Sequence, residues 1–411
     1  MDLANVFKNR TINHTIFYIT LDPERALGIE DVLPDYTIIC PYKSPLVNEM
    51  KNRGVNVVVL EDELKQKEVA EAIKKGTYGI LQSDFVRKYI KTYVQGSIPH
   101  VMILKNSQLI EDFCKKQGWK LLAPMAKVAE QFENKISQYK LLSNIVPFPK
   151  SITTTLDNLT FNVNNSVLQF NRGHSGNTTF FINSKKDLEK LAKKFPKREA
   201  KISEYIKGKT FTLNCLVLKS GRVIAGSISE QITGLKSATN NPNTTCGNDF
   251  TSPGNLSKMQ IKKIQEIAQS TGMALYKKDY RGLFGIDVII ENKTGKLYFI
   301  EVNTHQPASI SFEAKLHRQI GKMPLLAYFI LDSLGRGVKP AKEIRQLAKP
   351  PIVLPIKAKQ IIYRNKTGKT LRLKDIEKKY KGKGLISRTK FIKPNEEIYR
   401  RQQWNNRKIG Q

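Results

Sequence analysis

The chain has 411 residues, of which 40% are hydrophobic and 26% are charged, a composition that allows two or three domains with their own cores. No apolar run reaches the length of a transmembrane helix, and the N-terminus lacks the pattern of a signal peptide, so we expect a cytoplasmic protein without a membrane span. The four cysteines are scattered without a C-x-x-C pair, which predicts reduced thiols and argues against a zinc site.

The charge is strongly positive, with 69 Lys and Arg against 36 Asp and Glu. Residues 339–411 alone hold 22 basic and 5 acidic residues. A basic surface attracts anions such as nucleotides, nucleic acid or acidic metabolites. The alternative is a set of solvated lysines spread along every helix, and composition alone does not separate the two interpretations.

Residues 1–125 alternate between strand-like and helix-like segments. Strands are expected at 15–21, 36–42, 55–60 and 100–105, and helices at 44–54 and 107–118. Strands that alternate with helices of this length predict βαβ units and a parallel sheet.

The middle of the chain changes character. An amphipathic pattern predicts one helix over 126–145, a Gly-rich hairpin follows at 167–183, and a second helix is expected at 184–195. Strands are then expected at 201–206, 210–218, 222–231, 284–291 and 296–303, and helices at 257–272 and over most of 311–335. The polar segment 235–255 is long for a structureless loop, which favours a functional lid.

After 335, a proline-punctuated joint leads into a small basic tail domain with one clear strand at 359–365. Its aromatic residues are interleaved with Lys and Arg. Such a mixture can stack on nucleic-acid bases, or it can form the core of a small domain.

The tip of the hairpin reads Arg172-Gly173-His174-Ser175-Gly176-Asn177. A Walker A loop would need a Lys-Ser/Thr pair and a following helix, and neither occurs here. Two strands can still carry a glycine-rich tip onto phosphate groups and donate backbone N–H groups to them. A simple hairpin turn is the alternative.

Two carboxylates and an amide are predicted to converge on a second hairpin. Glu301 and Asn303 lie on one face of a strand because side chains alternate with a period of two. If this strand pairs with its predecessor through a turn at Thr294 and Gly295, Asp287 lies opposite Glu301. Carboxylate and amide oxygens suit Mg²⁺ that bridges nucleotide phosphates, whereas two exposed acids on a hairpin are the alternative.

These pieces resemble the ATP-grasp enzymes, especially the branch of biotin carboxylase and carbamoyl-phosphate synthetase. The resemblance spans about residues 100–335, and it depends on the order of ENKISQYKLLSNIVPFP, the Gly-rich hairpin, ISEYIKG, GLFGIDVII and YFIEVNTHQ. It implies an α/β and α+β protein with an ATP-grasp fold. Its parts would be a βαβ pre-grasp domain at 1–125, an ATP-grasp domain at 126–337 with metal-binding strands at 284–303, and a small basic C-terminal domain at 338–411.

The resemblance also implies roles for single residues. Asp287, Glu301 and Asn303 match the metal ligands, and Arg281, Lys236 and His305 are assigned to phosphate or substrate contacts. Lys135 matches the first phosphate-binding lysine, the loop 173–178 matches the flap that closes over the phosphates, and Glu204–Ile206 match the hinge that contacts the adenine. The nucleotide-binding positions are Lys135, Gln169, Arg172, Gly173, Ser175, Gly176, Asn177, Thr178, Glu204, Tyr205 and Ile206.

Two of these positions depart from the family pattern. Gln169 stands where a second phosphate-binding lysine is usual, with Arg172 as the substitute charge. His305 replaces an arginine of the biotin carboxylase branch, which argues against a carboxylase that fixes bicarbonate.

The function implied is that of an ADP-forming ligase that uses ATP and Mg²⁺ or Mn²⁺. A small-molecule carboxylate would become an acyl phosphate, and an amine or another nucleophile would then displace phosphate. One alternative is an ATP-binding module without turnover, and another is a protein that binds nucleic acid or a polyanion through its basic tail. The resemblance also leaves room for a homodimer.

Overall fold

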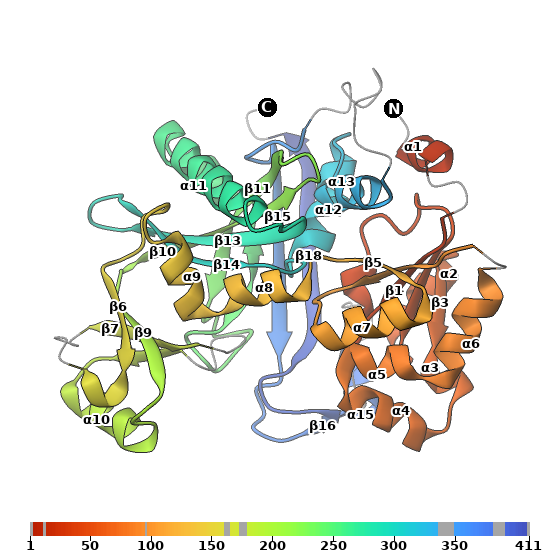
Figure 1. Ribbon diagram of the computed structural model, residues 1–411, viewed down its shortest axis with the longest axis horizontal. Coiled ribbons are helices and arrows are strands. Elements are labelled where there is room, and N and C mark those ends of the chain that lie inside the picture. The colour runs from red at the N-terminus through yellow and green to blue at the C-terminus, as the bar shows by residue number, and fades with distance from the viewer. Residues whose placement is uncertain are drawn as a thin grey trace.

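The computed structural model describes residues 3–10, 14–94, 97–159, 165–171, 179–335, 349–380 and 391–408. These residues form a five-stranded, a four-stranded and a seven-stranded sheet, with a two-stranded ribbon near the C-terminus (Figure 1). Within this part of the chain, no helix combines the length and the apolar character needed to cross a membrane. The predicted mixture of α/β and α+β structure is confirmed.

The first sheet is parallel throughout, as the alternation of strands and helices predicts. Its strand order is β3-β2-β1-β4-β5, so the order reverses between β1 and β4. Ligands of open α/β sheets bind beyond the carboxyl ends of the strands at such a reversal. The strands are β1 (Ile16–Ile19), β2 (Tyr36–Cys40), β3 (Asn56–Val59), β4 (His100–Ile103) and β5 (Lys120–Leu122).

Helices lie on both sides of this sheet. Ser44 and Ser107 begin two of the predicted helices, because their hydroxyl oxygens accept hydrogen bonds from backbone N–H groups of the first turn. The segment between β3 and β4 contains four helices that the sequence analysis did not assign. The helices are α1 (Leu3–Arg10), η1 (Pro23–Ala26), α2 (Pro45–Asn52), α3 (Leu60–Glu63), α4 (Gln66–Lys74), α5 (Gly76–Gln82), α6 (Asp84–Tyr93) and α7 (Gln108–Gln117).

One hydrophobic core joins this sheet to a helix from the other end of the chain. Helix α13 (Leu325–Ser333) is apolar nearly all round, and Leu326, Ile330 and Leu331 have no exposed surface. They belong to the same buried cluster as Ile16 and Tyr18 of β1. Each such side chain contributes about 2 kcal/mol when it is removed from water, so α13 ties the N-terminal sheet to the rest of the molecule.

The four-stranded sheet is antiparallel and contains the predicted Gly-rich hairpin. Its strand order is β6-β9-β7-β8, and β7 pairs with β8 as the hairpin prediction requires. One face packs on α10 (Lys185–Lys194) through a core that includes Leu168, Phe170 and Ile202. The other elements are β6 (Ser151–Thr155), η2 (Leu156–Asn158), β7 (Ser166–Phe170), β8 (Thr179–Ile182) and β9 (Glu199–Glu204).

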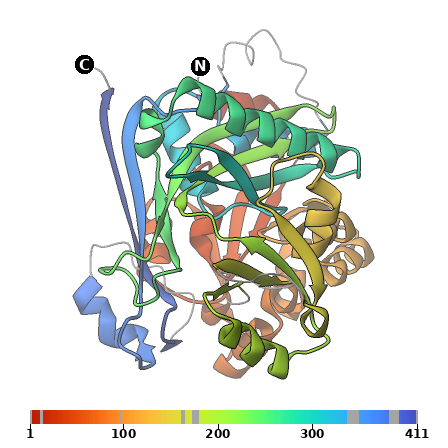
Figure 2. The same cartoon turned by 90° about the vertical axis from the view of Figure 1, so that its left-hand side faces the viewer.

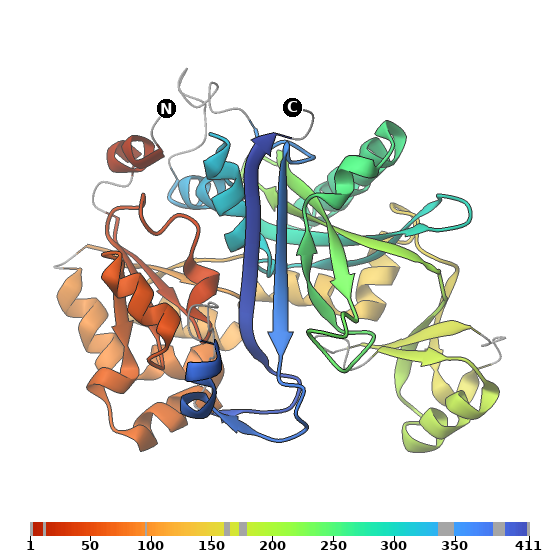
Figure 3. The same ribbon diagram turned by 180° about the vertical axis from the view of Figure 1, so that it is seen from behind.

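The seven-stranded sheet has the order β14-β13-β10-β11-β12-β15-β18. Figure 3 shows its last two strands upright between the N-terminal sheet and the remainder of the molecule. The strands are β10 (Gly208–Val217), β11 (Val223–Thr233), β12 (Thr245–Asp249), β13 (Gly282–Glu291), β14 (Leu297–Asn303), β15 (Ile356–Arg364) and β18 (Glu397–Lys408). The basic tail therefore supplies two strands of this sheet, and the predicted domain boundary at 337 stays a prediction.

The segment 235–255, which the sequence analysis interprets as a polar lid, forms part of the large sheet. It contains β12 and the short helix η3 (Ser252–Asn255), and β12 pairs with β11 on one side and β15 on the other. Gly247 makes this pairing possible. Its φ is +127°, and a Cβ at this position would lie 1.9 Å from the carbonyl oxygen of Gln360.

Two further helix predictions need correction. The expected single helix over 126–145 is divided into α8 (Ala126–Glu133) and α9 (Lys135–Leu142), because Asn134 leaves helical geometry and its side chain caps α9. The helical segment 311–335 is likewise divided into α12 (Ile310–Gln319) and α13.

Figure 2 shows α11 (Lys258–Tyr276) across the large sheet. The tail adds β16 (Leu371–Arg372), α15 (Leu373–Tyr380) and β17 (Phe391–Ile392).

Candidate active site

Asp287 on β13 and Glu301 on β14 lie directly opposite each other in an antiparallel pair, in the register that the sequence predicts. Their neighbours Ile286, Val288 and Val302 point into the hydrophobic core under the sheet. The strand period of two therefore directs both carboxylates to the opposite face. Asn303 lies on this face as well, so the three predicted metal ligands come together.

The carboxylate of Asp287 is held by donors from three strands. Its Oδ1 accepts hydrogen bonds from the Thr212 hydroxyl at 2.6 Å and from the Gln231 amide at 2.8 Å. The amide nitrogen of Asn303 lies 3.3 Å from Oδ2 of Asp287 and 3.4 Å from Oε1 of Glu301. These contacts fix the orientation of a carboxyl group that is only 8% exposed.

Lys135 forms an ion pair with Glu301. It is the first residue of α9, which the cap at Asn134 begins. The backbone N–H of Lys135 also donates to the carbonyl of Asn171, at 3.1 Å, at the end of β7. The predicted phosphate lysine therefore lies between the carboxylate pair and the base of the Gly-rich hairpin.

Burial and like charge give the two carboxylates different electrostatics. Burial, together with the neighbouring charge of Glu301, raises the pKa of Asp287 to about 7. Burial acts in the same direction on Glu301, but the Lys135 ammonium outweighs it and lowers the pKa of that carboxyl. Two carboxylates this close are both ionised only when a cation between them offsets their repulsion.

The donor set fits a divalent cation with hard oxygen ligands. Asp287, Glu301 and the side-chain oxygen of Asn303 would hold it from two adjacent strands. Among the described residues, no group of three or more His, Cys, Asp and Glu side chains is arranged to hold a metal ion, so oxygens of a bound ligand would have to complete the coordination.

Lys201 on β9 is a residue of this site that the sequence analysis missed. It is 3% exposed and lies opposite Gln169 in the β7–β9 pair. Its ammonium lies 5.1 Å from the centre of the Phe148 ring. A lysine in a strand pattern carries no signal of its own, and only the pairing of β7 with β9 places it beside Gln169.

The predicted adenine-contacting segment Glu204–Ile206 connects the two antiparallel sheets. Glu204 ends β9 and is exposed, and β10 of the large sheet begins two residues after Ile206. Tyr205 is 48% exposed, and its ring packs edge-on against Phe181 with the centroids 5.8 Å apart. A short connection between two sheets can act as a hinge. The contact of Glu204–Ile206 with adenine stays a prediction.

The predicted flap residues Arg172, Gly173, Ser175, Gly176, Asn177 and Thr178 lie outside the described residues. Gln169 at the base of the flap is buried, and its amide nitrogen lies 3.5 Å from the Thr179 hydroxyl oxygen.

The three residues assigned to phosphate or substrate contacts do not gather at the carboxylate pair. Arg281 stacks on the Tyr276 ring at 3.8 Å and donates to backbone carbonyls. It precedes Asp287 by six strand residues, or about 20 Å. Lys236 is exposed in the turn between β11 and β12. His305 lies two residues beyond Asn303 in the chain.

His305 joins the large sheet to the N-terminal sheet. Its Nδ1 lies 2.6 Å from Oε1 of Glu133, whose other oxygen takes an ion pair from Lys105 at 2.9 Å. Burial acts against ionisation of Glu133, but His305 and Lys105 outweigh burial and lower its pKa. Because Lys105 follows β4, this cluster lies near the strand-order reversal of the parallel sheet.

A row of polar side chains extends from the carboxylate pair across the large sheet. Its members occupy opposing positions on successive strands, with one step of two residues along β11. The row consists of Glu301, Asp287, Thr212, Ser229, Gln231, Asn248, Gln360 and Gln402. At its far end the amides of Gln360 and Gln402 donate to Glu24 at 3.2 and 2.9 Å. This row gives the site a hydrogen-bonding floor.

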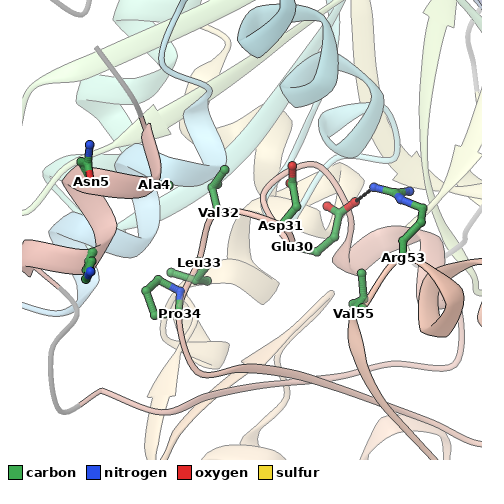
Figure 4. Close-up of a pocket in the computed structure, with 11 residues that line it drawn as sticks. Ala4, Asn5, Glu30, Asp31, Val32, Leu33, Pro34, Arg53 and Val55 are labelled. Carbon is green, nitrogen blue, oxygen red and sulfur yellow. Dashed lines mark hydrogen bonds and ion pairs between the residues drawn. The ribbon is translucent and has the colours of Figure 1, made fainter.

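A separate cavity of about 480 Å³ lies beside the N-terminal sheet, between α1 and the segments that enter β2 and β3. Figure 4 shows Arg53 directed toward Glu30 at its edge, and the two form an ion pair at 3.1 Å. Its residues precede the amino ends of parallel strands, the end opposite to that where α/β sheets bind ligands. It is therefore no part of the candidate active site.

Comparisons with known proteins agree with this geometry. Residues 132–308 match the family model described as the ATP-grasp domain. Among solved structures, biotin carboxylase from Campylobacter jejuni in a β,γ-ATP complex aligns with a TM-score of 0.62 and 14% identity over 95% of this chain and 87% of that one. L-amino acid ligase from Bacillus licheniformis aligns with 0.59 and 14%, over 96% and 94%.

A third structure is N5-carboxyaminoimidazole synthase from Aspergillus clavatus in complex with ADP and 5-aminoimidazole ribonucleotide, with a TM-score of 0.58 and 12% identity over 94% of this chain and 93% of that one. A search of curated protein sequences finds no match. At these identities the structural likeness establishes the fold. Residues 132–308 match the ATP-grasp domain, which agrees with the resemblance found in the sequence.

Proposed function

We propose that this protein is an ATP-dependent, ADP-forming ligase that joins a small-molecule carboxylate to an amine or a related nucleophile. The proposal rests on one arrangement of three residues. Asp287 and Glu301 lie opposite each other on neighbouring strands, and Lys135 forms an ion pair with Glu301 where the two antiparallel sheets meet. A cation-binding carboxylate pair beside a partly buried lysine is suited to nucleotide phosphates.

The roles of the individual residues follow from their positions. Mg²⁺ or Mn²⁺ held by Asp287, Glu301 and Asn303 would neutralise charge on the phosphate oxygens. Lys135, now paired with Glu301, is placed to contact the same phosphates. Thr212 and Gln231 keep Asp287 oriented through the hydrogen bonds at 2.6 and 2.8 Å. Positioning and charge stabilisation supply most of the rate enhancement in phosphoryl transfer.

The reaction would run in two steps. A substrate carboxylate oxygen attacks the γ-phosphorus of ATP, the bond to the β,γ-bridging oxygen breaks, and ADP leaves with that electron pair. The amine then attacks the acyl carbon, and inorganic phosphate leaves as the amide bond forms. Glu204–Ile206 would contact the adenine, and the Gly-rich flap would cover the phosphates.

The second substrate would lie on the polar row of the large sheet. Its amide and hydroxyl groups donate and accept hydrogen bonds but carry little net charge, which suits a small polar molecule. His305 and Lys105 at the neighbouring sheet edge are positioned for an anionic group of the substrate. Among the related structures, the Aspergillus clavatus protein holds a small nucleotide together with ADP.

Binding of nucleic acid through the basic tail is less well supported. Tyr363 and Tyr399, two of its aromatic residues, stack on each other with centroids 4.4 Å apart across β15 and β18. The stacked rings stabilise the pairing of β15 with β18, the two strands that extend the large sheet. We therefore favour the ligase.

The experiment that tests the ligase uses Mg-ATP, pools of small carboxylic acids, and hydroxylamine as a general acceptor. Hydroxylamine traps an acyl phosphate as a hydroxamate whatever the natural amine is. We expect one pool to raise ADP release and to yield a hydroxamate. ADP release without hydroxamate, whichever acid is present, would contradict the acyl-phosphate route.

A further inference from the structure

Lys201 lies on the face of β9 that is turned away from the core of the small sheet. Its neighbours Ala200 and Ile202 belong to that core and are fully buried. Strand alternation therefore directs the Lys201 side chain to the other face, toward the carboxylate site. The residue is nevertheless 3% exposed, which is rare for lysine.

No anionic group compensates this buried cation within the part of the chain that the structure describes. Glu301 is the acidic side chain that attracts it, but Glu301 already forms an ion pair with Lys135. Lys135 repels Lys201, and the Phe148 ring at 5.1 Å supplies only a weak attraction. A buried charge without a partner is costly, so a site that keeps one is built for an anion from outside.

The electrostatics of the side chain agree with this geometry. Burial, together with the charge of Lys135, lowers the pKa of Lys201 to about 8. An anion placed between the two lysines would reverse both effects, because it replaces lost solvation and screens the repulsion.

We propose that Lys201 and Lys135 together form the cationic cradle for the triphosphate of the bound nucleotide, with Lys201 supplying a phosphate contact from β9. This inference rests on the proposed function, since it takes the ligand to be Mg-ATP. Each ammonium offers three donors to phosphate oxygens, and the two approach from different elements, α9 and β9.

The pairing of β7 with β9 explains why Gln169 can be neutral. Gln169 and Lys201 occupy opposing positions in the antiparallel pair, and both lie on the face away from the core of the small sheet. Side chains at such positions have their Cβ atoms about 5 Å apart. A lysine at either position could bring its ammonium group to the same place, so the positive charge can come from β7 or from β9.

This exchange provides a sharp test. We would compare the wild-type chain with Lys201→Met, with the double variant Lys201→Met/Gln169→Lys, and with Lys197→Met as the control. Lys197 is an exposed lysine in the turn before β9. Titration calorimetry would measure binding of Mg-ATP and of adenosine, which has the base and ribose but no phosphate. Thermal melting would confirm that each variant is folded.

We expect Lys201→Met to weaken Mg-ATP binding by about 10- to 100-fold, the size of one lost charge-assisted hydrogen bond. Adenosine binding and the Lys197→Met control should be unchanged. Restoring the charge from β7 should recover most of the Mg-ATP affinity. Methionine at 201 removes an uncompensated buried charge, so the variant is expected to fold.

The two ways to fail are distinguishable. If the wild-type chain binds Mg-ATP and Lys201→Met binds it equally well, the role of Lys201 is wrong and the proposed function stands. If Lys201→Met weakens Mg-ATP and adenosine alike and the double variant does not recover, the lysine supports structure and not phosphate. If the wild-type chain does not bind Mg-ATP, both proposals fail together.

Discussion

The side chain of Gln231 on β11 donates a hydrogen bond to Asp287 on β13, across the intervening strand β10. The Thr212 hydroxyl of β10 bridges the two, because it donates to Asp287 and accepts from Gln231 at 2.8 Å. Side chains from β10 and β11 thus orient the Asp287 carboxylate of β13, and this carboxylate faces Glu301 on β14. This arrangement leads to predictions for the carboxylate, its support and the lysines beside it.

The first prediction concerns Asp287 itself. Asp287→Asn removes a negative charge from the cation site while it retains the size of the side chain. We expect Mg-dependent ADP release to fall by at least about 100-fold, since electrostatic stabilisation of the transition state is lost. The chain should fold normally, because a buried repulsion between carboxylates is also removed.

Asp279→Asn is the matched control for this variant. Asp279 is 80% exposed at its side chain and has a φ of +63°, a conformation that asparagine adopts readily. Its activity should equal that of the wild type. Full turnover in Asp287→Asn would refute the assignment of Asp287 as a metal ligand.

The second prediction concerns Gln231, which orients Asp287. Gln231→Leu leaves the cation ligands in place but removes a donor from Asp287, so kcat should fall by about 10-fold. Thr212 still donates to the carboxylate, which limits the loss. Steady-state kinetics over a range of Mg²⁺ concentrations would show whether added Mg²⁺ restores part of the rate.

The exposed residue Gln108 at the start of α7 offers a control, since Gln108→Leu makes the same chemical change far from the site. If both leucine variants lose activity equally, the loss at 231 reflects a general effect on the fold.

The third prediction is a pH dependence of nucleotide affinity. The pKa of Lys201 is lowered to about 8, and only the protonated ammonium attracts phosphate. Affinity for Mg-ATP should therefore decrease as the pH rises through 8, where Asp287, whose pKa is raised to about 7, is already largely ionised. Lys135 and Glu301 are the charged groups that act on Lys201, and Glu301, whose pKa is lowered, stays ionised over this range.

Calorimetry between about pH 7.5 and about 9.5 would measure this decrease, with Lys201→Met as the reference. The Met variant should bind weakly but with little pH dependence in this interval. An equal decrease in both proteins would assign the titration to another group.

The fourth prediction tests the corrected segment around β12. Gly247→Ala places a Cβ 1.9 Å from the carbonyl oxygen of Gln360 at a φ of +127°, so β12 and β15 cannot keep their spacing. We expect a loss of about 2–4 kcal/mol in the free energy of unfolding, measured with denaturant.

Gly254→Ala is the control, because nothing lies within 4 Å of a Cβ at that glycine. If β12 were only a lid without a structural role, the two alanine variants would have the same stability.

Much of the candidate site could be predicted from the sequence. The pairing of Asp287 with Glu301 followed from strand alternation and a single Gly-containing turn, both of which are local signals. Lys135 followed from the ENK motif of the family resemblance, and its ion pair with Glu301 places it at the site, although the start of a helix at this residue was not predicted. These predictions succeed because the residues that decide them are neighbours in the chain or lie across one hairpin.

The remainder depends on pairings between distant segments. Nothing in the residues around Lys201 indicates that β9 pairs with β7. The strand β12 contains Gly247, Asn248 and Asp249, residues with low β-propensity, and its structure is imposed by β11 and by β15 from the basic tail. The division of the helix at Asn134 reflects a capping residue that an amphipathic pattern alone does not reveal.

The central claim is that a substrate carboxylate receives the γ-phosphoryl group of ATP. The most direct measurement uses an acid identified by the hydroxamate assay, with its carboxyl group labelled with ¹⁸O, in a complete reaction with Mg-ATP and an amine. The account predicts that the released inorganic phosphate contains ¹⁸O from the carboxyl group, detected by mass spectrometry. Unlabelled phosphate, formed in equal amount with the amide product, would contradict it.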